Sequence, residues 1–202
     1  MAAVPDIVRR GEEVVWLAPI PPELRDFALR DLDAGKATAL FCAENTHSLD
    51  LVSMNVGPLQ RRGIYEEALL DALTATRTNN RRYSTLELRY LLGLAERTKL
   101  RAAGDPLPHS GPYTVYRGVA GRGAARRVRG VSWTGSLERA RWFAQRFGLA
   151  DPSVYRATVG EADVLAYSNG RQEDEYVVVL PAGARLTRVW RGDGATPRGT
   201  GA

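Results

Sequence analysis

The segment from Asp105 to Pro112 (DPLPHSGP) most constrains what this 202-residue chain can fold into, because the hydrophobic pattern changes across it. Prolines and glycines at this density end regular secondary structure. Before the segment, apolar residues recur at the three- and four-residue spacing of helices. After it they form short runs rich in Val, Tyr and Thr, as strands do. The pattern predicts an α+β protein, with a helical region over residues 1–110 and a strand-rich domain over residues 111–191.

The first half carries clear helix signals. Residues 23–35 follow two prolines and stop at a glycine, and residues 64–77 have an apolar stripe at helical spacing. Ser84 and Glu87 have the spacing of a capping box, which predicts a helix that ends near Gly104. Such stripes indicate a hydrophobic core rather than a functional surface.

The second half predicts six short strands and one helix. The strands are expected over residues 113–116, 131–134, 154–159, 163–167, 175–180 and 185–190. Ser136 is expected to cap the helix and Gly148 to end it. Its predicted buried face consists of Leu137, Ala140, Phe143, Ala144 and Phe147. The tail, residues 192–202, has a small and polar composition and is predicted to be disordered.

The composition limits the classes of partner and cofactor. The net charge is +5, and all basic residues except Lys36 and Lys99 are arginine. This favours a solvated surface over a nucleic-acid surface, because an arginine bias can reflect genome composition alone. One cysteine, Cys42, and two histidines, His47 and His109, argue against a zinc site and against an intrachain disulfide. We expect Cys42 to be buried.

The N-terminal residues 1–15 are interrupted by charges and lack the apolar core of a signal peptide. No apolar run reaches the length of a transmembrane helix, so we expect no membrane partner. The expected location is the cytoplasm, and export by a route that reads no cleaved signal stays open.

Three pieces of the second half carry the chemistry. Arg117 and Gly118 end a strand; a Ser-x-Thr strand, residues 131–134, leads into a helix with Phe143-Ala144; and Glu173 and Glu175 precede an apolar strand. In this order and these contexts the pieces resemble the Arg–Ser–Glu mono-ADP-ribosyltransferases with a Glu-x-Glu motif. That group includes bacterial toxins and phage-borne modifying enzymes. The resemblance covers residues 113–190 and none of the first 104 residues.

The resemblance implies a fold of two small packed β-sheets with flanking helices. It implies transfer of ADP-ribose from NAD to a macromolecular acceptor, with release of nicotinamide and without a metal. Arg117 and Gly118 would bind NAD, with the planar guanidinium on phosphate or ribose oxygens. Ser132 and Thr134 share one face of their strand, because they alternate with Trp133, which is expected in the core. They would support the nicotinamide pocket and hold the catalytic glutamate.

The same resemblance gives each glutamate a role. Glu175 would bond the ribose 2′-hydroxyl and stabilise the cationic transition state, which resembles that of glycoside cleavage. Glu173 would position or deprotonate the acceptor, with arginine favoured, and shares the face of Glu175 if the segment is extended. Tyr167 and Asn169, in the loop before this pair, would recognise the acceptor.

Each residue also has a structural interpretation. In that interpretation Arg117 is a surface arginine, Ser132 and Thr134 lie on a solvent-exposed sheet face, and the two glutamates belong to a solvated acidic turn. Two further functions stay open: an NAD glycohydrolase that uses the same site, and a catalytically inactive basic binding module. The sequence favours a protein acceptor, with nucleic acid as the alternative. Whether Arg117, Ser132 and Glu175 converge discriminates between these hypotheses.

The loop over residues 121–130 holds four arginines: Arg122, Arg126, Arg127 and Arg129. It could contact NAD phosphates, an acidic protein or nucleic acid. The favoured interpretation is a mobile, solvated connector, because a glycine-rich loop costs entropy to order. There is no P-loop and no Rossmann glycine pattern between a strand and a helix.

Overall fold

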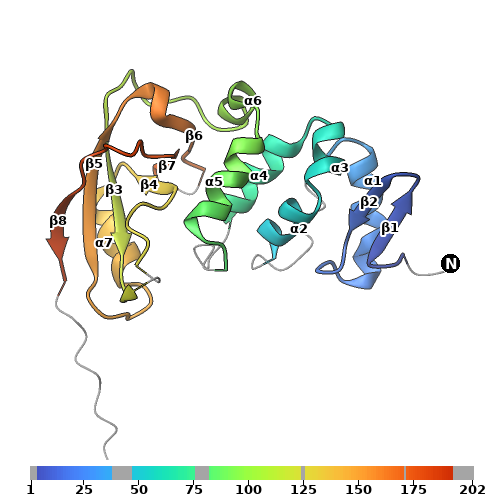
Figure 1. The fold of residues 1–202 in the computed structure, drawn as a ribbon, viewed down its shortest axis with the longest axis horizontal. Coiled ribbons are helices and arrows are strands. Elements are labelled where there is room, and N and C mark those ends of the chain that lie inside the picture. The colour runs from blue at the N-terminus through green and yellow to red at the C-terminus, as the bar shows by residue number, and fades with distance from the viewer. Residues whose placement is uncertain (1–3, 38–46, 76–81, 124–125, 171, 193–202) are drawn as a thin grey trace, which may run out of the picture. The chain divides into compact units, whose positions relative to one another are not determined.

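The computed structural model describes residues 4–37, 47–75, 82–123, 126–170 and 172–192. Its helices and strands confirm the α+β class (Figure 1). The chain divides into two compact units, Met1–Gly104 and Asp105–Ala202. Cys42 and the tail from residue 193 onward lie outside the described residues, so their predicted burial and disorder stay predictions.

The first unit contains helices together with one small antiparallel hairpin. In chain order its elements are β1 (Ile7–Arg10), β2 (Glu13–Trp16), the 3-10 helix η1 (Pro22–Leu24), α1 (Arg25–Asp33), α2 (Ser48–Met54), α3 (Val56–Arg61), α4 (Tyr65–Ala75), α5 (Thr85–Leu94) and α6 (Arg97–Ala102). Sequence reasoning missed the hairpin. Its strands are only four residues long and carry charges, which hides the alternation that marks a strand.

The helix signals of the first unit are confirmed in most details. The Ser84 Oγ accepts a bond from the Glu87 amide, and the Glu87 carboxylate accepts one from the Ser84 amide, which completes the capping box at α5. Gly35, just beyond α1, has a φ of +71°. The helix expected to reach Gly104 is instead two helices, because Ala95 has an extended backbone and ends α5.

The second unit has the six predicted strands and the predicted helix. Its elements are β3 (Tyr113–Val119), β4 (Ser132–Thr134), α7 (Leu137–Gln145), β5 (Ser153–Val159), the 3-10 helix η4 (Glu161–Asp163), β6 (Val164–Ser168), β7 (Glu175–Val178) and β8 (Thr187–Arg191). The Ser136 Oγ caps α7 by accepting a bond of 3.2 Å from the Arg139 amide, as predicted.

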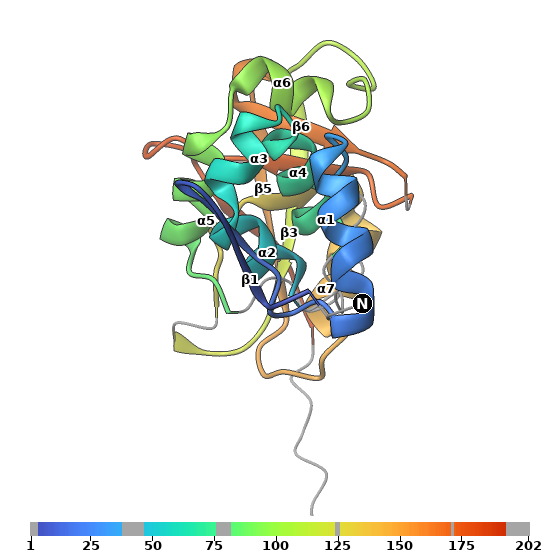
Figure 2. The same cartoon turned by 90° about the vertical axis from the view of Figure 1, so that its right-hand side faces the viewer.

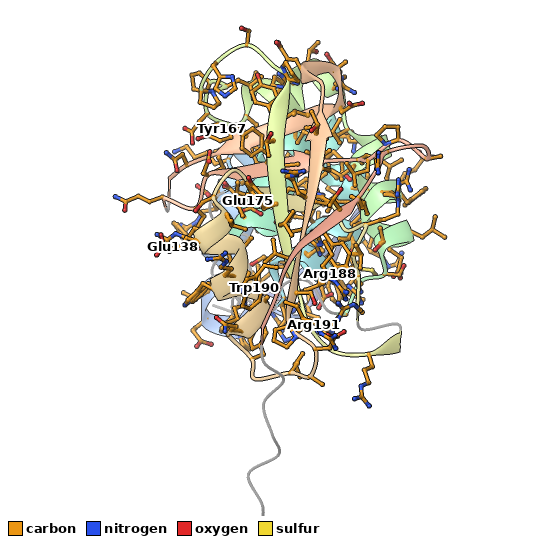
Figure 3. The ribbon with its side chains drawn as sticks, turned by 90° about the vertical axis from the view of Figure 1, so that its left-hand side faces the viewer. Glu138, Tyr167, Glu175, Arg188, Trp190 and Arg191 are labelled. Atoms are coloured by element: carbon orange, nitrogen blue, oxygen red, sulfur yellow. The ribbon has the colours of Figure 1, made fainter. Side chains whose placement is uncertain are left out.

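The six strands form one antiparallel sheet in the order β6-β7-β4-β3-β5-β8, where two separate sheets were expected. A single register pair, Tyr116 with Thr134, joins β3 to β4. Because so few hydrogen bonds hold this joint, the sheet can bend there, and its two three-stranded halves run in different directions (Figure 3). The main core takes residues from both halves, including Val115, Trp133 and Val178, so the halves pack on each other.

Helix α7 covers the opposite face of β3 and β5. Ala140 and Ala144 pack there against Val154 of β5. Trp190 of β8, labelled in Figure 3, packs against the same cluster. Phe147 is 43% exposed, against the prediction that it belongs to the buried face. The reason is that α7 ends at Gln145, so helical spacing no longer decides which way Phe147 points. None of the described helices is both long and apolar enough to cross a membrane.

Candidate functional site

Three adjacent strands bring the predicted core of the site together. β4 lies between β3 and β7, and in its register Thr134 pairs with Tyr116 on one side and with Glu175 on the other. Arg117 follows Tyr116 on β3, and Ser132 lies two residues before Thr134. Arg117, Ser132 and Glu175 therefore converge, although the first and the last are 58 positions apart in the sequence.

The centre of the site is a hydrogen bond between a serine and a glutamate. The Ser132 Oγ donates to the Glu175 Oε1 over 2.5 Å. Glu175 is the first residue of β7 and is only 9% exposed, and the rest of that strand is buried as well. A buried carboxylate has few orientations open to it, and a short bond from a hydroxyl fixes one of them.

Arg117 is buried beside this pair and binds main-chain oxygens. Its Nε donates to the carbonyl of Arg127 over 2.9 Å, and its Nη1 donates to the carbonyl of Ser132. Burial lowers the pKa of Arg117 to about 10, and the charge of Glu175 opposes that shift. The guanidinium stays protonated at neutral pH. It places a positive charge near Glu175 and fixes the strand that carries Ser132.

A glycine that sequence reasoning did not single out makes room for this arginine. A Cβ at Gly130 would lie 2.2 Å from the Arg117 Nη2, so a larger residue would displace the guanidinium. Gly118, for which NAD binding was predicted, packs closely against the neighbouring helix. A Cβ there would lie 1.9 Å from the carbonyl oxygen of Ala140, which shows that Gly118 faces α7. Neighbours on a strand face opposite sides, so the structure does not bring Gly118 together with Arg117.

Thr134 bonds the backbone just before β7 and the backbone at the start of α7. Its Oγ1 donates to the carbonyl of Glu173 over 2.7 Å and accepts a bond from the Ser136 amide over 3.1 Å. Thr134 is 3% exposed. The threonine thus ties the start of α7 to the residues immediately before Glu175.

The segment before Glu175 is a tight turn rather than an extended strand. Gln172 and Asp174 have φ values of 56° and 49°, which are in the left-handed region. The prediction that Glu173 and Glu175 share a face depends on alternation along a strand, and alternation does not apply here. β7 begins only at Glu175. The backbone therefore places Glu173 at the turn and Glu175 in the sheet.

Tyr167 and Asn169 maintain this turn. Tyr167 is 5% exposed, and its hydroxyl donates to the Asp174 Oδ1 over 2.8 Å. Burial raises the pKa of Tyr167, and the bond to Asp174 adds to the effect. The Asn169 Oδ1 accepts a bond from the Asp174 amide over 3.2 Å. The Tyr167 ring packs 4.8 Å from that of Tyr176, and the predicted role of Tyr167 in acceptor recognition stays a prediction.

The sequence analysis did not identify two residues that fix this turn, Asp174 and Gly135. Asp174 accepts the bond from Tyr167, and its carbonyl accepts one from the Gly135 amide over 2.9 Å. A Cβ at Gly135 would lie 1.9 Å from the Asp174 Oδ2, so the turn requires glycine there. The sequence does contain one signal. A glycine directly between a strand and a helix cap, as Gly135 is, indicates that another group approaches the backbone closely there.

The basic loop is anchored over much of its described length. The Arg126 Nη1 binds Asp151 through a carboxylate oxygen at 2.9 Å and the carbonyl at 2.7 Å. Arg129 donates to the carbonyl of Pro181 over 2.5 Å. Residues 124 and 125 lie outside the described part. Arg126 and Arg129 thus hold the loop to its own domain, which differs from the expected mobile connector.

Within the described residues, no group of three or more His, Cys, Asp or Glu side chains could hold a metal ion. No family model, no curated protein and no solved structure matches the chain.

Proposed function

We propose that the second unit is an NAD-dependent mono-ADP-ribosyltransferase, which moves ADP-ribose from NAD to a macromolecular acceptor and releases nicotinamide. The observation that carries the proposal is the bond of 2.5 Å from Ser132 to Glu175 beside the buried charge of Arg117. A fixed carboxylate in a site of low dielectric stabilises a developing positive charge more strongly than one in water.

The reaction breaks the bond between the ribose C1′ and the nicotinamide nitrogen, and both electrons leave with nicotinamide. The ribose then carries positive charge, as in glycoside cleavage. Glu175 faces this charge, and Ser132 holds its carboxylate in one orientation. An acceptor atom forms the new bond to C1′ and loses a proton. Glu173, at the turn before the strand, takes that proton or holds the acceptor.

Arg117 contributes by positioning and by charge. Its bonds to the carbonyls of Arg127 and Ser132 fix the two backbone segments that flank the site. Its charge also favours an anionic substrate such as the pyrophosphate of NAD. Arginine as the acceptor accords with the carboxylate of Glu173, which can hold a guanidinium by two hydrogen bonds.

The test is incubation with NAD, followed by separate measurement of free nicotinamide, free ADP-ribose and mass added to candidate macromolecules. Transfer predicts nicotinamide together with added mass. Nicotinamide with an equal amount of free ADP-ribose would instead identify an NAD glycohydrolase. No nicotinamide under any condition, from a folded protein, would reject both enzymes and leave the inactive binding module.

Two variants sharpen this test. Ser132→Ala removes a hydrogen bond to a charged group and should slow nicotinamide release by about tenfold or more. Thr158→Ala, on the exposed side of β5, is its control and should be silent. Glu173→Gln should abolish transfer to a macromolecule while some hydrolysis of NAD remains. Equal loss of both activities would show that the two glutamates act as one unit.

A further inference from the structure

A β-bulge in the last strand changes the direction of one arginine. In the pairing of β5 with β8, Val154 opposes Trp190 and Tyr155 opposes Arg188. Val189 is therefore an extra residue on β8. Residues 188 and 190 would share a face of a regular strand, but the extra residue places them on opposite faces. Val189 and Trp190 pack on the α7 side, whereas Arg188 takes the other face of the sheet (Figure 3 labels Arg188 and Trp190).

The redirected arginine joins a row of polar side chains that crosses three neighbouring strands. Tyr155 opposes Arg117 of β3 on one side and Arg188 of β8 on the other. Opposed residues of an antiparallel pair point to the same face, so these three side chains share one face. Neighbouring strands are about 4.8 Å apart, which places Arg188 roughly 10 Å across the sheet from Arg117. Arg117 is 8% exposed, Tyr155 is half-buried and Arg188 is exposed, so the row runs from the candidate site to the solvent.

A fourth side chain covers the middle of this row. The Arg126 Nη2 donates to the Tyr155 hydroxyl over 3.4 Å, and the guanidinium carbon lies 5.8 Å from the centroid of the tyrosine ring. Because the tyrosine hydroxyl accepts this bond, its own hydrogen can still be donated. The Arg126 Nη1 is bound by Asp151 at 2.9 Å. Arg126 and Tyr155 are therefore held in place before a ligand binds, which lowers the entropy cost of binding.

The charge of Arg188 is not paired within the described part of the chain. Arg126 and Arg191 share the carboxylate of Asp151, whereas no described carboxylate forms an ion pair with Arg188. The unit around it also has an excess of positive charge, because residues 105–202 contain fourteen basic and nine acidic residues. An exposed and unpaired guanidinium in a positive field attracts an anion.

We propose that Arg188, Tyr155 and Arg126 form a binding site for a phosphate group. The planar fork of Arg188 can bond two phosphate oxygens, and the Tyr155 hydroxyl can bond a third next to the charge of Arg126. A carboxylate has only two oxygens and would use fewer of these donors. An extended polyanion fits less well, because its binding depends on several unpaired cations, and in this row only Arg188 is unpaired.

The phosphate has two chemical sources: a free phosphate ion, or the pyrophosphate of a dinucleotide whose ribose lies at the Ser132–Glu175 pair. Arg117 gives its Nε and Nη1 to main-chain carbonyls, so a pyrophosphate needs further donors, and Arg188 on the same face supplies them. The second source rests on the proposed transferase activity. The phosphate site itself does not, because binding of inorganic phosphate is measured without NAD.

The experiment is isothermal titration calorimetry of the full chain with inorganic phosphate and with pyrophosphate, at constant ionic strength. Both ligands should bind. Arg188→Gln removes hydrogen bonds from a charged group and should weaken the binding of both by about tenfold or more. Arg188→Lys keeps the charge without the planar fork and should lose less affinity than Arg188→Gln. Tyr155→Phe keeps the ring beneath Arg126 but removes a donor, and should weaken binding by roughly threefold or more.

The matched control is Arg156→Gln. Arg156 directly follows Tyr155 on β5 and is also exposed, but it opposes Tyr116, which packs on the α7 side of the sheet. The control removes the same charge from the opposite face and should leave the affinity for phosphate nearly unchanged. Because Arg156 and Arg188 are both exposed, both variants should keep the melting curve of the parent, and this is measured first.

Titration with NAD and with ADP-ribose distinguishes the two sources. If Arg188→Gln weakens the binding of NAD as much as that of pyrophosphate, the site holds the pyrophosphate of the dinucleotide. If it weakens only the binding of inorganic phosphate and pyrophosphate, the site takes its phosphate from another ligand. Phosphate binding without any release of nicotinamide would reject the transferase and support the site. Two results would overturn the site: no binding of phosphate or pyrophosphate to the folded chain, or equal weakening by Arg156→Gln and Arg188→Gln.

Discussion

The two units use arginine in opposite ways. In the first unit, arginines bond carboxylates directly: Arg62 bridges Glu13 and Asp33, and Arg10 and Arg61 add further bonds to the same two acids. The bond from Arg62, followed by the bond from Arg61, lowers the pKa of Glu13 to about 2 although desolvation opposes the shift. Each carboxylate of this network is engaged by two guanidinium groups.

In the second unit, the buried arginine binds the backbone and the buried carboxylate binds a hydroxyl. Arg117 donates to two carbonyls, and Glu175 accepts a bond from Ser132. A carboxylate bonded by two arginines is well suited to hold a fold together. A carboxylate that is held by a hydroxyl keeps more of its negative charge for a cation that forms next to it. The comparison therefore separates a stabilising network in the first unit, whose hairpin β1–β2 and helix α1 can be followed in Figure 2, from a candidate site in the second unit.

The largest expected effect on stability contrasts one arginine from each unit. Arg117→Ala leaves two carbonyls and a glutamate without the guanidinium, and should cost about 3–5 kcal/mol of unfolding free energy, as for other broken buried ionic groups. Arg61→Ala removes a half-exposed partner of Glu13 and should cost less than about 1 kcal/mol. Urea unfolding measures both, and similar costs would erase the distinction between the two units.

Two glycine variants should change stability in opposite directions. Gly118→Ala drives a Cβ into the carbonyl of Ala140 and should destabilise by about 3 kcal/mol. Gly93→Ala, in the last turn of α5 with open space around it, should stabilise by up to about 1 kcal/mol. Thermal unfolding distinguishes them. If Gly118→Ala instead kept full stability and lost NAD affinity, Gly118 would return to the NAD-binding role that the sequence suggested.

Tyr167→Phe tests whether the turn before Glu175 is held from within the domain. The change removes the hydroxyl that bonds Asp174 and should cost about 1 kcal/mol. Tyr90→Phe, at an exposed position of α5, is the matched control and should cost nothing measurable. Denaturant titration gives both values. An unchanged stability combined with a specific loss of transfer would show that Tyr167 meets the acceptor after all.

The smallest effect concerns pH and the first unit. Because the folded-state pKa of Glu13 is about 2 against an ordinary 4.5, its contribution is complete above pH 4.5 and is lost as the pH falls toward 2. Because Arg61 and Arg62 are partly exposed to solvent, which screens their charges, Glu13 contributes only about 1 kcal/mol to the free energy of unfolding. The difference in melting temperature between the parent and Glu13→Gln should therefore shrink as the pH is lowered through this window. A difference that stays constant would show that Glu13 is not held by Arg61 and Arg62.

Local signals in the sequence predicted much of the fold. The capping box of Ser84 and Glu87 and the cap at Ser136 are set by neighbours in sequence, so they could be recognised without a structure. The six strands were found for the same reason. The bend of the sheet at the Tyr116–Thr134 pair was not, because the number of hydrogen bonds between two strands depends on their register.

The sequence predicted the arrangement of the candidate site only for residues that lie on regular strands. Ser132 and Thr134 alternate on β4, so their shared direction followed from strand geometry. The turn at Asp174 could not be predicted, since a left-handed backbone at an aspartate depends on the contacts of Tyr167 and Asn169. The partners of Arg117 likewise come from segments that only the tertiary fold brings near it.

The most direct test of the central claim, that Arg117, Ser132 and Glu175 form one NAD-cleaving site, is nicotinamide release by Glu175→Gln. The substitution keeps the size of the side chain and an oxygen that accepts the bond from Ser132, but removes the charge. Glu161→Gln, on the exposed 3-10 helix η4, is the control and should keep full activity. Glu175→Gln should release nicotinamide about two to three orders of magnitude more slowly while its melting curve stays close to that of the parent. Near-normal release by the folded variant would contradict the assignment.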